Sequence, residues 1–311
     1  MIDFRYHIVS LTAVFLALAV GVVLGTTALK GPILADLRSQ VSRLADDNRA
    51  LRQDVRTLKD DASKQDSFAE EVAPALLAGR LTGKSVTVVS GPGGDTQDRD
   101  AIVADLTRSG AKVMSRVRLA KDFTDPKRSA ELKALVSQLL PAGVQIPESA
   151  DGAAQAGRLL AAVLTSGGTK TPVGAASRQS VISGFQGLNL LAVDGEITEV
   201  ADLAVIVTGP PNTGAEDKTR NSALLEFVKE FDTQAKKTVL GAATTDGDGN
   251  VVAAVRGDDN VAKSLSTVDD IADPAGRIAV VLALAAESGG RSSGQYGIGD
   301  GATGRLPPLE P

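Results

Sequence analysis

An uncharged stretch near the amino end most constrains what this chain can fold into. Residues 8–29 read IVSLTAVFLALAVGVVLGTTAL and carry no acidic or basic side chain across 22 positions. As a helix they would rise ~33 Å, enough to cross a hydrocarbon core of roughly 30 Å. A cleaved signal peptide usually has a shorter apolar core and a more basic start, and a buried globular helix would carry more polar residues. We predict an uncleaved transmembrane anchor, with those two interpretations as the alternatives.

The flanks of this segment say little about its orientation. Arg5 precedes it and Lys30 follows it, so the positive charges are balanced. The short amino-terminal tail, residues 1–7, favours a simple signal-anchor. This predicts a cytoplasmic tail and a single-pass cell-membrane protein whose bulk is extracytoplasmic.

Small residues recur along one side of the predicted anchor at Ala17, Gly21 and Gly25. The last two form a GxxxG pattern, which lets two helix backbones approach closely in a membrane. The pattern is common by chance in apolar segments. We interpret these three positions as a candidate surface for helix packing in the membrane.

A regular apolar pattern follows the anchor over residues 31–66. Gly31-Pro32 predicts that a new or kinked helix begins there, because proline suits a helix start. Two interleaved series then repeat every seventh residue: Leu34, Val41, Asn48, Val55 and Ala62 at position a, and Leu37, Leu44, Leu51 and Leu58 at position d. Valine at a with leucine at d favours parallel two-stranded coiled coils. Asn48 at a would cost stability but specify the register.

The charges beside this seam support the same interpretation. In a parallel pair, Asp47 at g would face Arg52 at the partner's e position, and Asp54 would face Lys59. The prediction is therefore a homodimer or a coiled coil with a different protein. Two anchors in one membrane would raise the effective concentration of the helices. The alternative is a single amphipathic helix packed on its own globular domain.

The remaining chain alternates β-rich and helical patterns. After a linker over 67–83, residues 84–288 predict an α/β domain with a mostly parallel, Rossmann-like sheet. Residues 201–209 predict a buried strand, and residues 113–119 a strand with one solvated face. The glycine- and proline-rich tail, residues 289–311, predicts irregular structure.

Composition excludes several classes of function. The net charge of −5 and the scarcity of aromatic residues argue against a nucleic-acid partner. The chain has no cysteine and one histidine, His7, so it cannot build a thiolate site, a Ser-His-Asp triad or a multi-histidine metal site. We expect neither an enzyme nor a metal or cofactor site.

Three short patterns admit a functional and a structural interpretation. The loop with Gly91, Gly93, Gly94 and Asp95 stands where a phosphate cradle could lie, which would make this a small-ligand-binding α/β domain. It lacks the G-x-G-x-x-G spacing, so a structural turn is the alternative. Asp246–Asn250 lacks the glycine and glutamate of a calcium loop and predicts a hairpin turn. Asp258-Asp259 and Asp269-Asp270 predict solvated or helix-capping carboxylates.

The whole chain resembles the actinobacterial MctB family of copper-transport proteins, which includes the cell-separation protein SteB. The resemblance rests on the block MIDFRYHIVSLTAVFLALAVGVVLGTTAL, the heptad helix and the ending GQYGIGDGATGRLP. It implies a mycolate-type actinobacterial envelope and a role in copper homeostasis. The SteB likeness implies instead a partner such as the membrane protein SteA and control of a septal peptidoglycan hydrolase.

The residues bear differently on these two roles. Cu(I) prefers thiolate, thioether and imidazole ligands. Beyond the initiator methionine the chain offers Met114 and His7, which makes a copper site of its own unexpected. An outer-membrane pore would need many alternating strands that close a barrel. A bitopic coiled-coil protein better suits a scaffold or hydrolase regulator, with copper handled indirectly or through an oligomer.

Overall fold

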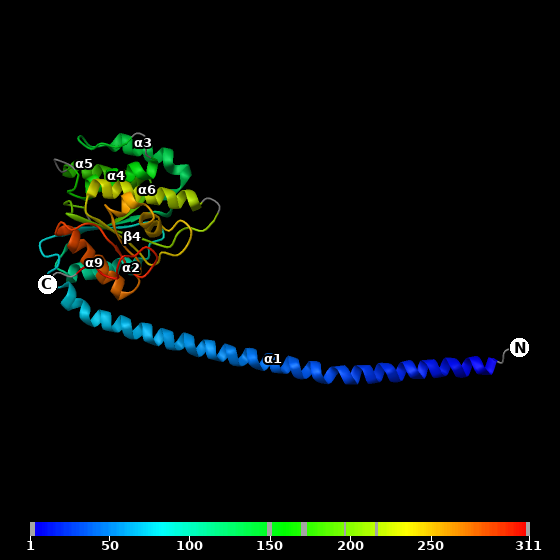
Figure 1. The fold of residues 1–311 in the computed structure, drawn as a ribbon. Helices are drawn as coiled ribbons and strands as arrows, with labels where there is room; N and C mark the ends of the chain where they lie inside the picture. The colour runs from blue at the N-terminus through cyan, green and yellow to red at the C-terminus, as the bar shows by residue number, and fades with distance from the viewer. Residues whose placement is uncertain (1–3, 148–150, 169–172, 196, 215–216, 309–311) are drawn as a thin grey trace. The chain divides into compact units, whose positions relative to one another are not determined.

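The computed structural model describes residues 4–147, 151–168, 173–195, 197–214 and 217–308, apart from the side chains of Arg5 and residues 26–36. The chain divides into two compact units, Met1–Gln65 and Asp66–Pro311. Figure 1 traces both along the chain, and each is described by itself.

The first unit is helical. Helix α1 spans Phe4–Leu77, so its last turns, from Asp66 onward, belong to the second unit. Of the two predictions for Gly31-Pro32, a new helix or a kinked one, the first was wrong, because both residues lie inside α1. About half of residues 37–65 are alanine, leucine, arginine or glutamine, which are among the strongest helix formers.

The second unit is built on a seven-stranded sheet with the order β3-β2-β1-β4-β5-β6-β7. The strands are β1 Ser85–Ser90, β2 Lys112–Leu119, β3 Leu191–Asp194, β4 Leu203–Thr208, β5 Thr238–Ala242, β6 Ser266–Val268 and β7 Gln295–Tyr296. Every pairing is parallel except β2 with β3. The predicted mostly parallel α/β sheet is confirmed. The predicted buried strand is β4, in which every residue is buried.

Helices cover both faces of this sheet (Figure 1). On one side lie α2 Thr96–Arg108, α9 Pro274–Ser288 and the buried end of α1. On the other lie α3 Ser129–Leu139, α4 Gly152–Leu164, α5 Ala175–Gly187 and α6 Asp217–Ala235, with the short 3-10 turns η1 Lys121–Thr124 and η2 Pro126–Arg128. All of α4 except Arg158 is buried, because α3 and α6 both pack against it.

One hairpin prediction was wrong. The run VVAAV after Asp246–Asn250 is not a strand but the first part of helix α7, Val251–Arg256. The side chain of Asn250 caps this helix by accepting hydrogen bonds from Val252 N at 2.9 Å and Ala253 N at 3.2 Å. The cap overrides the β preference of the valines, since it supplies partners for amides that a helix start leaves free. A second short helix, α8 Asp259–Ala262, is capped by Asp258 as expected.

The carboxyl-terminal segment was expected to be irregular, and this was wrong for part of it. Gln295 and Tyr296 form β7, which pairs with β6 and completes the sheet. Both residues are buried. Tyr296 also forms an isolated parallel bridge with Gly304, so the segment continues along the same edge.

Candidate functional site

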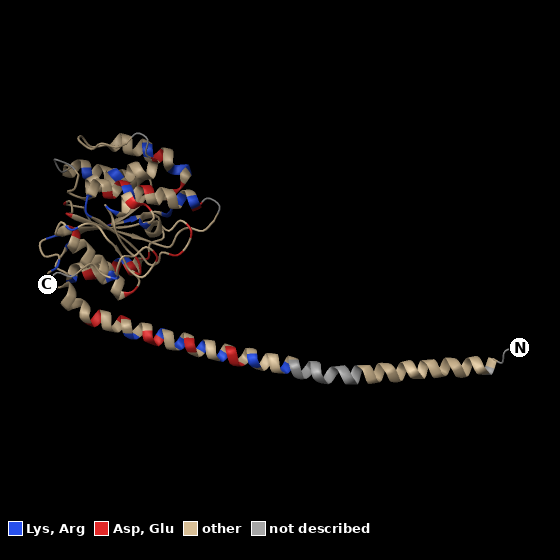
Figure 2. Ribbon diagram, viewed as in Figure 1, with Lys and Arg blue, Asp and Glu red and all other residues tan. Residues whose placement is uncertain are grey.

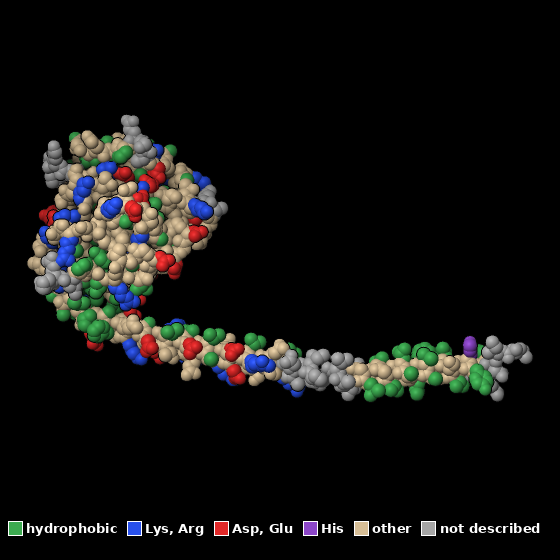
Figure 3. Space-filling model, in the orientation of Figure 1, with side chains coloured by type: hydrophobic (Ala, Val, Ile, Leu, Met, Phe, Trp, Pro, Cys, Tyr) green, Lys and Arg blue, Asp and Glu red, His purple; other side chains and the backbone are tan. Residues whose placement is uncertain are grey.

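The heptad seam in α1 is exposed in the single chain. Six described apolar seam residues keep between 50% and 69% of their surface in contact with solvent: Leu37, Val41, Leu44, Leu51, Val55 and Leu58. Asn48 and Ala62 are exposed as well, and the side chain of Leu34 lies outside the described residues. Green apolar side chains accordingly appear between charged ones along this stretch in Figure 3. A regular apolar stripe without cover is unusual for a soluble surface.

Asn48 lies at the edge of a hollow on the helix surface. The hollow is open, measures about 330 Å³ and is lined by Asn48, Leu51, Arg52, Val55, Arg56 and Lys59. In a coiled coil, each knob side chain inserts into a space bounded by such residues of the facing helix. The arrangement can receive an apolar side chain while Asn48 retains an amide for hydrogen bonding.

The charged residues beside the seam are not engaged with one another in the single chain. Within the described chain, Asp47, Arg52, Asp54 and Lys59 form no ion pair. The pairs that do form in this stretch are Arg49 with Asp46 at 2.5 Å and Lys64 with Asp61 at 2.9 Å, each three residues apart. Figure 2 shows acidic and basic residues mixed along this part of α1. Exposed pairs of this kind contribute little to stability.

The predicted anchor is a helix in the structure. Of the described residues, Tyr6–Gly25 form the one segment long and apolar enough to cross a membrane, and none of its apolar window is buried in the protein. Ala17 and Gly21 are exposed, and no atom lies within 4 Å of a Cβ added at Gly21 or Gly25. The small-residue face is therefore open for contact with another helix.

The glycine loop after β1 packs against the loop after β4. The topological switch of the sheet falls between these two strands, where α/β proteins commonly bind ligands. Gly91 N donates to Val207 O at 2.8 Å, and a Cβ added at Gly209 would lie 2.0 Å from Gly93 O. Asp95 caps α2 by accepting from Gln97 N at 2.7 Å. The backbones of the two loops are thus in contact at the switch point. The Asp95 carboxylate occupies the amino end of α2, where an anion would otherwise bind.

A buried ion pair that sequence reasoning missed holds the carboxyl-terminal segment. Arg256 Nη1 lies 2.7 Å from Asp269 Oδ2, with side chains 3% and 1% exposed. Arg256 Nη2 donates to Tyr296 O at 2.6 Å, and Asp269 accepts from Ile298 N at 2.7 Å and Gly299 N at 3.0 Å. Asp269 is therefore buried and paired. The expectation of a solvated or helix-capping carboxylate was wrong at this residue. Its place directly after a strand was the available signal, but nothing in the sequence links it to Arg256.

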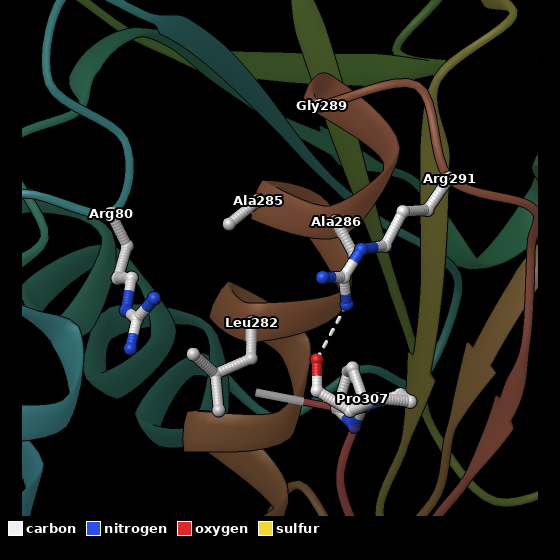
Figure 4. A pocket seen from close by; sticks show the side chains of 8 residues that line it. Arg80, Leu282, Ala285, Ala286, Gly289, Arg291 and Pro307 are labelled. Carbon is white, nitrogen blue, oxygen red and sulfur yellow. Dashed lines mark hydrogen bonds between the residues drawn. The ribbon is translucent and has the colours of Figure 1, made fainter. Parts of the chain in front are cut away.

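A small pocket lies on the outer side of α9. It measures about 190 Å³ and is lined by Arg80, Leu282, Ala285, Ala286, Gly289, Arg291, Pro307 and Pro308. Figure 4 shows the guanidinium groups of Arg80 and Arg291 on either side of the apolar helix face. Arg291 Nη1 donates to Pro308 O at 2.6 Å, which ties the pocket wall together.

No group of three or more His, Cys, Asp or Glu among the described residues could hold a metal ion. The whole sequence supplies the soft donors His7, Met1 and Met114, and no cysteine. These thioether and imidazole groups are of the types that Cu(I) prefers, but they are few and lie far apart in the sequence.

Comparison with known proteins places the chain in a family. The family model described as "Copper transport outer membrane protein, MctB" matches residues 1–307. The chain belongs to the MctB family. Proteins named "Copper transporter MctB" from Mycobacterium tuberculosis (strain ATCC 25618 / H37Rv) and Mycobacterium bovis are 33% identical to it, over 97% of this chain and 98% of theirs. The Mycobacterium leprae protein of that name is 31% identical over the same shares.

The MctB match covers both units, from the anchor to the segment that carries β7. The family description assigns copper transport and an outer-membrane location. The single apolar helix near the amino end is compatible with a single-pass membrane protein.

Proposed function

We propose that this MctB-family chain is a non-enzymatic, single-span envelope protein that acts in copper homeostasis or export by pairing through α1 and binding partner proteins. One observation carries the proposal: six regularly spaced apolar residues of α1 are at least half exposed in the single chain. Full burial of a leucine or valine side chain contributes about 1.5–3 kcal/mol. A second helix is the structure that covers such a stripe at heptad spacing.

The seam has a defined end in this arrangement. After Ala62 the next d position is the polar Gln65. In a parallel pair, Asp61 at g would face Asp66 at the partner's e position, which would bring like charges together. The boundary between the two compact units falls between Gln65 and Asp66. We infer that pairing stops there, which leaves each α/β unit able to meet other proteins.

The donor inventory supports an indirect role in copper handling. Copper as cargo would need soft ligands, and this chain supplies few. We infer that a partner, or an assembly of several chains, contributes the copper ligands. The proposal places the amino terminus in the cytoplasm and both the coiled coil and the α/β unit outside it.

The test uses a deletion strain complemented with the full chain. Leu44→Asp/Leu51→Asp places charges in the seam, and Ala50→Asp/Gln53→Asp places the same charges on the outer side of the helix. We expect the wild type and the outer-face variant to restore normal copper tolerance to the deletion strain, and the seam variant to fail to do so. Equal rescue by both variants would remove the seam from the mechanism, and absence of any copper phenotype would remove the copper role.

The second candidate is a SteB-like septal scaffold that works with a SteA-like membrane protein and regulates a peptidoglycan hydrolase. The scarcity of soft copper donors favours it, together with a seam that can pair with a different coiled-coil protein. The same strains separate the two functions. Chained, unseparated cells with normal copper tolerance would indicate the septal role, and isolation of intact membrane complexes would identify the partner. Ligand binding at Gly91–Asp95 is a weaker alternative, since that loop already packs on the loop after β4.

A further inference from the structure

A pocket lies between the start of α6 and the turn Asp246–Asn250, whose DGDGN pattern stands out in the sequence. It measures about 340 Å³. Helix α6 follows β4 and the turn follows β5, so the pocket lies toward the carboxyl ends of two neighbouring strands, where α/β proteins commonly bind ligands. Its volume is at the lower end of the range for small-molecule sites, roughly 300–1,000 Å³, which favours a ligand smaller than a nucleotide.

One wall of this pocket is a face of α6. It is lined by Lys218, Asn221, Ser222 and Leu225. Residues at this spacing, with intervals of three and four, lie on the same side of a helix. Leu225, together with Ala254 of α7, supplies the apolar part of the lining. The wall therefore presents a cation near the amino end of α6 and an apolar patch about two turns further along.

Another wall is the turn, which packs closely on α6 at Asn221. This asparagine is 5% exposed, and its Nδ2 donates to Asn212 O at 3.1 Å while its Oδ1 accepts from Asn212 N at 3.1 Å. Gly249 has a φ of +82°, and a Cβ added there would lie 2.6 Å from Asn221 Nδ2. The close contact at Gly249 fixes the turn against the helix and places Asp248 in the lining of the pocket.

The two charged residues of the pocket do not neutralise each other. Lys218 and Asp248 both line it, and within the described chain neither forms an ion pair. Asp217, the acid beside Lys218, is not part of the lining, and its Oδ2 would lie 2.4 Å from a Cβ added at Gly214. The first turn of α6 also carries the positive end of the helix dipole. The pocket thus offers a positive position beside Lys218 and a negative one at Asp248.

We propose that this pocket binds a free aliphatic α-amino acid. The Lys218 ammonium and the amino end of α6 bind its carboxylate, Asp248 binds its ammonium, and the apolar patch contacts its side chain. A ligand with a single charge would leave either Lys218 or Asp248 without a counter-charge. The site is separate from both the seam and the loop Gly91–Asp95, and it goes beyond the proposed function.

Isothermal titration calorimetry of the full chain in detergent tests the site, with L-leucine and D-leucine as probes. We expect saturable binding of at least one enantiomer at one site per chain. N-acetyl-leucine lacks the ammonium and leucinamide lacks the carboxylate, so each derivative of the bound enantiomer should bind at least about tenfold more weakly. Because these ligands are compared on the wild type, this result does not depend on the folding of any variant.

Two variants assign the binding to its charged residues. Lys218→Met and Asp248→Asn should each weaken leucine binding about 10- to 100-fold, because each loses a hydrogen bond between charged groups. Asp246→Asn, in the same turn but outside the lining, and Lys263→Met are the matched controls, and both should bind leucine as the wild type does.

Three results would overturn the proposal. They are no saturable binding of either enantiomer to the wild type, equal binding of leucine and its two derivatives, and unchanged binding by both Lys218→Met and Asp248→Asn. None of these readouts depends on the seam, so failure here leaves the pairing proposal standing.

Discussion

Two stretches of the same helix differ in whether their apolar residues are buried. Between Leu37 and Leu58, α1 exposes its leucines, and Leu51 and Leu58 keep 63% and 69% of their surface in solvent. In its last turns, within the second unit, Ala73 and Leu77 are 3% and 0% exposed. Apolar residues recur at helical spacing in both stretches. The second stretch therefore packs into a core within the chain, whereas the first is an exposed apolar stripe for which we propose a partner helix.

The largest expected effect is on the free energy of unfolding of the α/β unit. Arg256→Met removes one member of the buried pair with Asp269 and leaves a buried carboxylate uncompensated. We expect a loss of about 3–5 kcal/mol in the free energy of unfolding, measured by denaturant titration. Arg118→Met is the control, because its contact with Asp194 is half exposed and worth about 0–1 kcal/mol. Equal losses in the two variants would contradict the role assigned to Arg256.

The two stretches of α1 can be compared with one substitution. Leu77→Ala should lower the stability of the α/β unit by about 2–5 kcal/mol, because it leaves a cavity in a closed core. Leu51→Ala should leave that unfolding free energy unchanged and weaken self-association instead. Denaturant titration and analytical ultracentrifugation measure the two effects. If Leu51→Ala destabilised the α/β unit as much as Leu77→Ala, the distinction between the stretches would fail.

A pH titration tests two buried carboxylates of the α/β unit, Asp232 and Glu287, which are 4% and 6% exposed. The pKa values of Asp232 and Glu287 are raised to about 7 from ordinary values of 3.8 and 4.5. Their protonated forms therefore favour the folded state. This contribution is complete below about pH 4 and is lost as the pH rises through 7, at up to about 1.4 kcal/mol per pH unit for each group. We expect lower stability at pH 8 than at pH 5, and a smaller decrease in Glu287→Gln.

The smallest expected effect concerns specificity rather than stability of the α/β unit. Asn48→Val should strengthen association of the helices, since the buried amide costs stability, but should allow higher oligomers. Mass measurement by light scattering separates dimers from trimers and tetramers. A variant that remained strictly dimeric would show that Asn48 does not set the oligomeric state.

The sequence predicts long elements well and short ones poorly. β4 and α4 follow from continuous apolar runs, and the exposed and buried sides of β2 follow from its alternation. β3, β6 and β7 have four residues or fewer and include polar side chains, so no periodicity marks them. Only their neighbours in the sheet make them strands. The valine-rich α7 shows a local cap overriding strand propensity.

The candidate sites divide in the same way. The seam is visible in the sequence because helical spacing is regular, and the structure adds that its residues are uncovered. Arg256 and Asp269 are thirteen residues apart. No local pattern joins them, so only the three-dimensional fold brings their charges together.

Disulfide formation at position 48 tests the pairing of α1 most directly. The natural chain has no cysteine, so Asn48→Cys introduces a single thiol at a predicted a position, and Gln53→Cys places one on the outer side. In native membranes under mild oxidation, we predict a disulfide-linked homodimer through position 48 and little through position 53. Monomer alone for both variants, or equal cross-linking of the two, would contradict a parallel, in-register homodimer.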